Sequence, residues 1–445
     1  MPPAFVESCI ETVSESAKAV YRLTRSKPRA RKLVRLLAGK RKVLVTTHMH
    51  PDPDALGSAL CMSHLLKVSL PQAQVHLSIK GQVGGGVNAA FTKLTNLNLV
   101  TWDDHALPEY DAIVLLDVQP NFAYSPLPLR EDGTRWEATA VIDHHPSRGP
   151  RPKAPFVDIR TDVGAASSIV FAYFMELELD IPPDLGASLL FAIESDLAGA
   201  AGAPGGLDNM ALSSLTLIAD ARKLYQMRYV NLPRSYFTTF ADGLANAVQF
   251  GNVLVTHLDE IDSLEKPAVL ADFLLRYEET AWVLVTARRE DRLILSLRTQ
   301  SRQMSAGQVM RRLVRGIGVG GGHRTKAGGF IQLSGRNDHE VERYRKRLRV
   351  RLVRAVKVTE NVGRPLVSVP TAEEIKQRRK PLARKPKNPA LRPVPPIPPV
   401  PLLDNRSDNS PQPQPPAHSA ALAPPEPVTT PATPTDVIPP EDEQP

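Results

Sequence analysis

Cysteine and long apolar runs are both scarce in this chain of 445 residues. The two cysteines, Cys9 and Cys61, exclude a disulfide-stabilised scaffold and a structural zinc site with cysteine ligands. No run of about 18 apolar residues is present, so the sequence predicts no membrane-spanning helix. The first 20 residues include Glu7, Glu11 and Glu15 and lack the unbroken apolar stretch of a signal peptide. We therefore expect a cytoplasmic protein without a membrane partner.

Proline is instead abundant, and its distribution divides the chain. Of the 42 prolines, 23 lie between Asn361 and Pro445. Such a composition cannot bury a core, so we predict a disordered, proline-rich tail over residues 358–445. The stretch Pro393–Pro399 is compatible with a polyproline helix that binds a partner, or with a simple spacer. The sequence does not indicate what that partner would be.

The net charge of +8 is concentrated in three basic segments. Each segment could follow the phosphates of a nucleic acid, or it could be a solvated face or tail. Composition leaves both interpretations open. The segments are Arg22–Lys42, Arg343–Lys357 and Lys376–Arg392.

Short β-branched runs alternate with helical stretches from residue 42 onward. This alternation predicts an α/β domain with a parallel sheet over residues 42–225, after a basic helical lead-in over residues 1–41. A connecting helix (226–250), a smaller α+β domain (251–335) and a basic helix (336–357) follow. The expected strands of the first domain are Lys42–Thr47, Gln74–Ile79, Ala112–Leu116 and Ala138–Ile142, and its helices are Leu56–Val68, Ala165–Leu177 and Leu185–Ser195. The second domain should contain the strands Asn252–Thr256, Ala281–Ala287, Leu293–Arg298 and Gly328–Leu333 and the helix Ala306–Ile317.

Acidic and histidine side chains follow several expected strands of the first domain and end one of its helices. In open parallel sheets, ligand sites lie beyond the carboxyl ends of the strands. A single Asp at such a place is commonly a helix N-cap or a turn residue, but a whole set at one sheet edge is hard to explain in that way. The set is His48, Asp52, Asp54, Asp117, Asp143, His144, His145 and Asp196.

Carboxylates and imidazoles without thiolates indicate a metal centre. This donor set favours Mn²⁺ or Mg²⁺, and Zn²⁺, Fe²⁺ or Co²⁺ are also compatible. The acidic ligands are too many for one ion, so two ions are expected. Ions about 3.5–4 Å apart can share a carboxylate and a water and lower the pKa of that water into the physiological range. That water would be the nucleophile.

These residues form motifs that resemble those of the DHH phosphoesterase superfamily. The motifs are His48-x3-Asp52-x-Asp54, then Asp117, then Asp143-His144-His145, then Asp196. The glycine-rich run from Gly318 to Gly329 is similar to the signature of the DHH-associated domain. The resemblance covers roughly residues 42–333 and implies a DHH phosphoesterase domain over 42–225 and a DHH-associated substrate-binding domain over 251–335.

The resemblance also implies a role for each residue of the set. His48 and Asp52 would hold one metal ion, and Asp54, His144 and Asp196 would hold the other. Asp117 would bridge the two ions. As catalytic residues outside the metal ligands, Asp143 would orient a histidine and His145 would face the substrate phosphate. The expected cofactor is Mn²⁺, two ions per site, with Mg²⁺ or Co²⁺ as alternatives.

Candidate substrate-binding residues lie in the second domain. Gly320, Gly321 and Gly322 allow backbone amides to approach a phosphate closely. His323 adds a donor, as do the neighbouring Arg324 and Lys326. The resemblance further implies that Arg298, at the end of an expected strand, grips the substrate; without the resemblance, it could equally be an exposed edge residue.

Together these features predict a hydrolase, a metal-dependent phosphoesterase that acts on short oligoribonucleotides or 3′-phosphoadenosine 5′-phosphate. A cyclic-dinucleotide phosphodiesterase and an exopolyphosphatase or pyrophosphatase are enzymatic alternatives. A degenerate nucleic-acid-binding scaffold is the alternative without catalysis. Pro53 and Leu197 depart from the commonest form of the family motifs and leave the subfamily open. The expected partner is a short nucleic acid or a nucleotide, and the chain could form a homodimer.

Overall fold

The structure, a computed structural model, describes residues 3–24, 26–81, 83–147, 149–197, 204–322, 324–335, 337–360 and 362–367. All of them belong to the unit Met1–Glu374, whereas a second unit, Ile375–Pro445, lies outside the described residues. None of the helices in the described ranges combines the length and the apolar character that a membrane crossing requires.

Five parallel strands form the first sheet, in the order β2-β1-β3-β4-β5. All five residues of the central strand β3 are buried, as is typical of a parallel sheet that is covered on both faces. This sheet confirms the predicted α/β class. The strands are β1 (Lys42–Thr46), β2 (Gln74–Leu77), β3 (Ala112–Leu116), β4 (Ala140–Asp143) and β5 (Phe156–Ile159).

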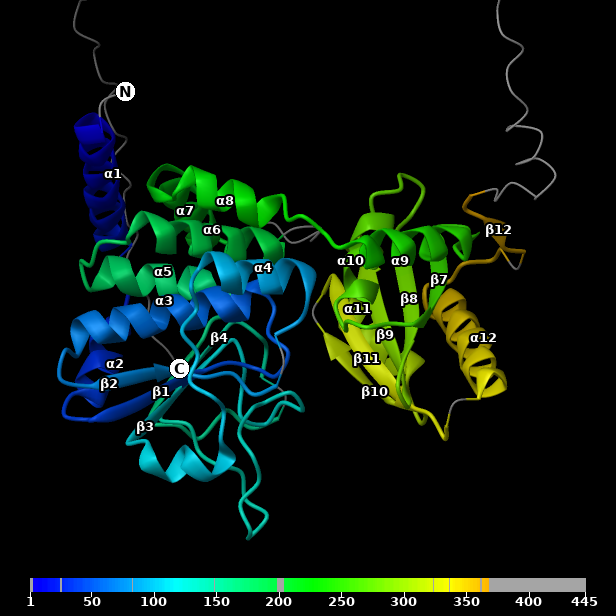
Figure 1. The fold of residues 1–445 in the computed structure, drawn as a ribbon, viewed down its shortest axis with the longest axis horizontal. Helices are drawn as coiled ribbons and strands as arrows, with labels where there is room; N and C mark the ends of the chain where they lie inside the picture. Colours follow the sequence, from blue (N-terminus) through cyan, green and yellow to red (C-terminus); the bar gives the residue numbers. More distant parts are fainter. Residues whose placement is uncertain are drawn as a thin grey trace, which may run out of the picture. The chain divides into compact units, whose positions relative to one another are not determined.

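Alternate side chains of these strands enter two separate cores. Val43 and Val45 of β1 pack into the larger core with the helices, whereas Leu44 packs into a smaller core with Leu107 and Phe122. Figure 1 shows α3, α5 and α6 lying together over one face of the sheet. The 3-10 helix η1 (Asp104–Glu109) and the segment 118–138 cover the other face.

Eight α-helices of the described residues accompany this sheet. α3 is buried along most of its length because it packs against both α5 and α6. The helices are α1 (Pro3–Leu23), α2 (Ala30–Leu37), α3 (Pro53–Ser69), α4 (Gly86–Leu94), α5 (Ala166–Glu176), α6 (Pro183–Leu197), α7 (Gly206–Ile218) and α8 (Ala221–Arg228).

A second, mixed sheet follows, in the order β10-β11-β9-β8-β7-β6-β12. β7 and β8 are parallel, and the other pairs are antiparallel. Helices α9 and α10 pack on one face, and α11 and α12 on the other. The strands are β6 (Val248–Phe250), β7 (Val253–Glu260), β8 (Trp282–Arg289), β9 (Arg292–Thr299), β10 (Val319–Gly322), β11 (Lys326–Gln332) and β12 (Arg364–Pro365), and the helices are α9 (Arg234–Ala245), α10 (Lys266–Leu274), α11 (Ala306–Leu313) and α12 (Asp338–Ala355).

The described residues of the glycine-rich run contribute to two paired strands, β10 and β11. In β10, Gly320 pairs with Gly329 and Gly321 with Gly328 of β11. Glycine is required where α11 meets this strand, because a Cβ on Gly307 would lie 2.1 Å from the carbonyl oxygen of Gly322.

The start of the predicted disordered tail contains an edge strand, which corrects that prediction in part. Arg364 and Pro365 form β12 and pair with β6, and the Leu366 N–H donates to the Ala247 oxygen at 2.9 Å. A pattern of two residues is too short to be recognised in a sequence. Residues 368–445 lie outside the described residues.

Candidate metal centre

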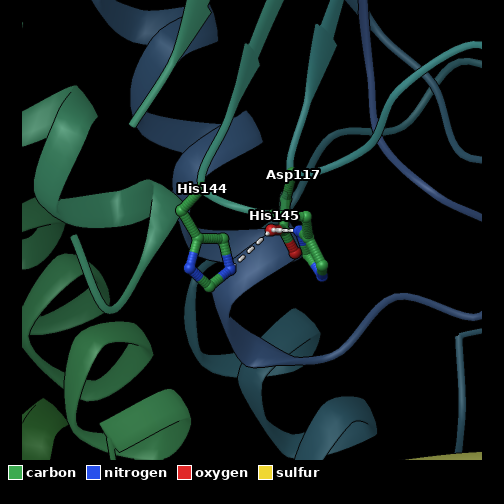
Figure 2. A group of neighbouring side chains, drawn as sticks. All are labelled: Asp117, His144 and His145. Carbon is green, nitrogen blue, oxygen red and sulfur yellow. Dashed lines mark ion pairs between the residues drawn. The ribbon is translucent and has the colours of Figure 1, made fainter. Parts of the chain in front are cut away.

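The order of the first sheet brings the carboxyl ends of β1 and β3 side by side, with β2 beyond one and β4 beyond the other. Ligand sites of open α/β sheets form at such switch points. His48 follows β1, Asp117 follows β3 and Asp143 ends β4, so all three lie at this edge. Figure 2 shows Asp117, His144 and His145 meeting there.

The loop after β1 delivers two carboxylates through the start of α3. Asp52 is the N-cap of this helix, and its Oδ1 accepts the Ala55 N–H at 3.1 Å. Asp54 is buried, and its two oxygens accept the N–H groups of Ala166 and Ser167 at the start of α5, at 2.7 and 2.9 Å. Asp54 is therefore fixed by two helices, whereas the side chain of Asp52 is about half exposed.

Asp117 lies between two histidines. It has a φ of 57°, in the left-handed region that Asp and Asn tolerate better than most non-glycine residues. Its Oδ2 lies 3.6 Å from His48 Nε2, and its Oδ1 lies 3.2 Å from His144 Nε2. One buried carboxylate thus faces both imidazoles.

Both imidazoles are oriented through their Nδ1 atoms. His48 Nδ1 lies 2.9 Å from the Met49 carbonyl oxygen, and His144 Nδ1 lies 3.3 Å from that of Val163. An Nδ1–H that donates to a backbone carbonyl leaves Nε2 as the ring atom that can bind a metal ion. This arrangement is common for histidines that bind metals.

Among the described residues, three groups of side chains are close enough to hold a metal ion, with one ligand atom of each residue within 4.8 Å of the others. In one group, His144 Nε2 lies 3.5 Å from Asp196 Oδ2 and 3.9 Å from Asp54 Oδ2. Two groups have the membership that the resemblance implies for two ions, with Asp117 beside both; that assignment stays a prediction. The groups are His48, Asp52 and Asp117; Asp54, His144 and Asp196; and Asp117, His144 and His145.

The chemistry of these donors fits a hard divalent cation. Two of the groups have two carboxylates and one imidazole, the third has one carboxylate and two imidazoles, and none of the three includes a thiolate. Asp117 Oδ1 is buried and lies 3.2 Å from His144 Nε2 and 3.4 Å from His145 Nδ1. A cation at these groups would find this oxygen and the imidazole nitrogens together.

The pKa shifts of the site also favour a bound cation. Burial raises the pKa of Asp54, and the negative charge of Asp117 raises it further. Although burial alone would lower it, the carboxylates of Asp117 and Asp52 raise the pKa of His48 to about 9. Burial likewise acts against charge on Asp117, but hydrogen bonds from His144 and His48 hold its pKa well below the usual range. Protons on the histidines thus balance the carboxylates, and a bound cation would displace them.

Asp143 lies behind His145 and orients it. Asp143 Oδ1 lies 2.7 Å from His145 Nδ1, which leaves Nε2 for other contacts. Gln119, which is fully buried, donates its Nε2 to Asp143 Oδ2 at 2.7 Å and to the backbone oxygen of His145 at 2.9 Å. The sequence assigned no role to Gln119, because a buried amide two residues after Asp117 belongs to no motif.

A cavity of about 950 Å³ opens beside His144 and Asp196. Gly322, a predicted substrate-binding residue, is part of its wall. Lys326 Nζ donates to the Ser195 carbonyl oxygen at 2.8 Å and lies 3.5 Å from Asp196 Oδ1. Among the described residues, four cationic side chains line the cavity, and sequence reasoning missed two of them, Arg302 and Arg311, because neither lies in a motif. The four are Arg302, Arg311, Arg324 and Lys326.

The remaining predicted substrate-binding residues lie in different surroundings. The Arg298 guanidinium is largely buried, forms an ion pair with Asp272 (Nε–Oδ1 2.6 Å) and donates to Ser296. A Cβ on Gly320 would lie 2.8 Å from Met310 Cγ, so this glycine permits close packing of α11. Gly321 lies in β10 between Gly320 and Gly322, and its substrate-binding role stays a prediction. His323 lies outside the described residues.

Comparisons with known proteins agree with this architecture. The family model described as DHH family, N-terminal domain, matches residues 42–193. An uncharacterized protein of Methanocaldococcus jannaschii is 27% identical over 295 residues, which are 66% of this chain and 59% of that protein. A probable manganese-dependent inorganic pyrophosphatase of Lactobacillus gasseri is 29% identical over 157 residues, 35% of this chain and 47% of that one. The matched parts therefore span about half of each relative's length.

The fold also matches a solved structure. The crystal structure of an exopolyphosphatase-related protein from Bacteroides fragilis aligns with a TM-score of 0.58 at 16% identity. The alignment covers 73% of this chain and 96% of that one. The family match covers the five strands of the first sheet and the residues from His48 to His145 at its edge. Over residues 42–193, this chain is therefore similar to the N-terminal domain of the DHH family.

Proposed function

We propose that this protein is a metal-dependent phosphoesterase that hydrolyses short oligoribonucleotides or 3′-phosphoadenosine 5′-phosphate. The observation that carries the proposal is Asp117, whose two oxygens face histidines of two separate ligand groups. Two groups around one carboxylate suit a pair of divalent ions. The manganese dependence in the name of the Lactobacillus relative favours Mn²⁺, with Mg²⁺ or Co²⁺ as substitutes.

The chain's own residues would hold the ions and orient the substrate. His48, Asp52 and Asp117 would hold one ion, and the group of Asp54 would hold the other, next to the same Asp117. When bound, such ions lower the pKa of a water into the physiological range and stabilise charge on a phosphoryl group. Asp143 fixes the ring of His145 with Nδ1 inward, so that Nε2 is the atom available to a phosphate oxygen.

The cavity supports a substrate larger than two linked phosphates. Its volume of about 950 Å³ is at the upper end of the ~300–1,000 Å³ that is usual for small-molecule sites. In the described part of its wall, four cationic side chains outnumber the two carboxylates of Asp162 and Asp196, which suits a ligand with several negative charges. A nucleotide or short oligonucleotide has both properties.

Hydrolysis of pyrophosphate or polyphosphate is the second candidate. The names of the Lactobacillus pyrophosphatase and of the exopolyphosphatase-related structure favour it. Because the same groups could activate water against either bond, the chemistry of the metal centre does not separate the candidates. A cyclic-dinucleotide phosphodiesterase and a scaffold without catalysis are the remaining alternatives.

A substrate panel in Mn²⁺ tests the proposal. The panel contains dinucleotides, longer RNA, single-stranded DNA, 3′-phosphoadenosine 5′-phosphate, a cyclic dinucleotide, pyrophosphate and polyphosphate. We expect turnover of dinucleotides or of 3′-phosphoadenosine 5′-phosphate, its loss in excess chelator, and a fall of kcat by at least about a hundredfold in Asp117→Asn. Asp242→Asn, an exposed change on α9, is the matched control and should retain activity.

Each outcome of the panel has a clear meaning. Full turnover in excess chelator would exclude a metal-dependent mechanism. Turnover of pyrophosphate or polyphosphate alone would replace the proposed substrates by the second candidate. Binding of RNA without turnover of any compound would favour the scaffold.

A further inference from the structure

A separate cavity of about 100 Å³ lies in the second sheet domain, between the face formed by β6, β7 and β8 and the helix α12. One water needs about 10–15 Å³ of such space, so the cavity has room for an anion of five non-hydrogen atoms. It contains none of the residues assigned to the metal centre or to the predicted substrate site.

The floor of this cavity is polar at one pair of residues, where the neighbouring pairs on the same sheet face are apolar. The register pairs Val253 with Trp282, Val255 with Leu284, and His257 with Thr286. The first two pairs belong to the apolar core under α11 and α12. The third pair replaces them with an imidazole and a hydroxyl, both buried and 2.9 Å apart (Nδ1 to Oγ1).

His257 can take part in a further contact. Its Nε2 lies 3.8 Å from Asp259 Oδ1, beyond hydrogen-bond length. Burial, together with the positive charges of Arg345 and Arg288, lowers the pKa of this imidazole to about 4. The ring is therefore neutral at pH 7.

The helix wall of the cavity is positively charged. Arg345, Lys346 and Arg349 of α12 line it, and Glu342 is the one carboxylate among the described lining residues. Glu342 Oε2 pairs with Arg345 at 3.0 Å, and its Oε1 lies 3.7 Å from Lys346. The Arg349 guanidinium lies over the ring of Phe250, with 5.3 Å between its Cζ and the ring centroid. Three cations and one carboxylate leave a net charge of +2.

Glu342 offsets only part of this positive charge. Arg345 and Arg349 are one helical turn apart, and like charges at this spacing destabilise a helix. Guanidinium groups bind phosphate oxygens through paired hydrogen bonds, and a terminal phosphate carries a charge of about −1.5 to −2 at pH 7. The size of the cavity and its net charge both match such a group.

We propose that the cavity between α12 and the β6–β8 face binds a phosphate group, held by Arg345, Lys346 and Arg349 over the His257–Thr286 floor. The ligand is a terminal phosphate, either free as inorganic phosphate or at the end of a nucleotide chain. This proposal does not depend on the activity of the metal centre.

Nuclear magnetic resonance of histidine side chains tests the proposal on the full chain in chelator. The protein is labelled with ¹³C-histidine, and the His257 signal is identified by its loss in His257→Gln. The probes are inorganic phosphate, a 5′-phosphorylated dinucleotide and the same dinucleotide without its terminal phosphate. We expect saturable movement of the His257 signal with at least one of the two phosphorylated probes and no movement with the third. The phosphorylated probe that binds more tightly identifies the source of the phosphate.

Two double variants distinguish binding in the pocket from nonspecific attraction of anions to the positive charge of α12. Arg345→Gln with Arg349→Gln removes two pocket cations and should weaken binding by about tenfold or more. Arg343→Gln with Arg347→Gln removes two exposed cations of the same helix and should change it less than about twofold. If the pocket double variant does not fold, Lys346→Gln, whose side chain is two-thirds exposed, replaces it and should weaken binding severalfold.

Two results would overturn the proposal. One is a His257 signal that stays unmoved by both phosphorylated probes. The other is equal weakening by the two double variants, which would show that α12 attracts anions without a defined pocket.

Discussion

Adding Mn²⁺ to the chelator-treated protein should raise its melting temperature, and Asp117→Asn should remove most of that rise. The reason is the crowding of carboxylates in the two ligand groups around Asp117. Without a cation, burial and the charge of Asp117 raise the pKa of Asp54, which means that its ionised form is disfavoured there. A divalent ion turns this repulsion into attraction, so it binds the folded chain in preference to the unfolded one.

The size of the effect follows from linkage. A ligand present at a hundred times its Kd stabilises the folded state by about 2.7 kcal/mol. For domains of roughly 150–250 residues, each kcal/mol corresponds to about 2–4 °C in Tm. We therefore expect a rise of about 5–10 °C for the wild-type protein. In Asp117→Asn, the loss of the shared charged ligand should reduce the rise to about 2 °C or less.

The assay is thermal unfolding followed by circular dichroism, with Mn²⁺ titrated against chelator. Asp242→Asn is the matched control, since it removes the same charge from an exposed place on α9 and should keep the full rise. An unchanged Tm of the wild-type protein in excess Mn²⁺ would refute the reasoning. An equal rise in Asp117→Asn would show that the ion binds elsewhere.

Three further variants test other contacts of the described residues. Asp54→Ala should be less stable in chelator than Asp54→Asn by about 1–2 kcal/mol in urea unfolding, because both remove the charge but only Asn keeps an oxygen for the amides of α5; equal stability would contradict this. Gln119→Leu should lower kcat by about tenfold or more, since His145 loses its support, yet keep the full Mn²⁺-dependent rise in Tm; loss of that rise would place Gln119 among the residues that the ions need. Glu265→Gln should raise Tm at pH 8 but not at pH 5: burial, helped by Asp262, raises the pKa of this carboxyl to about 7, so folding loses stability as pH rises through that value. An equal gain at both pH values would show that ionisation of Glu265 is not involved.

The sequence was sufficient to predict which residues lie at the carboxyl ends of the strands in the first domain. β3 has the predicted bounds, and the other predicted strands of that sheet differ from the observed ones by a few residues at their ends. Apolar strands followed by acids or histidines are a local signal, and strand ends of a parallel sheet meet by necessity. For this reason the sequence alone predicts that His48, Asp117 and His144 lie together.

Features that depend on distant partners could not be predicted. Arg298 is paired with Asp272 of α10, a helix without a clear sequence signal, so its ion pair became visible only in three dimensions. β10 carries three glycines in four residues and therefore lacks the alternation that marks a strand; its pairing with β11 defines it. Gln119 follows β3, and it reaches Asp143 and His145 at the end of β4 only because these two strands are neighbours.

The hydrogen bonds of Asp54 to α5 bear on how related sequences should be interpreted. A member of the family that had lost its ions would still need an acceptor at this place to satisfy the first amides of α5. Selection for folding alone would then retain Asp or Asn at the equivalent of position 54, while the equivalents of His48 and Asp196 would be free to drift. An acid at position 54 is therefore weak evidence that a relative is active. The residues at the equivalents of His48 and Asp196 distinguish an active enzyme from an inactive relative with the same fold.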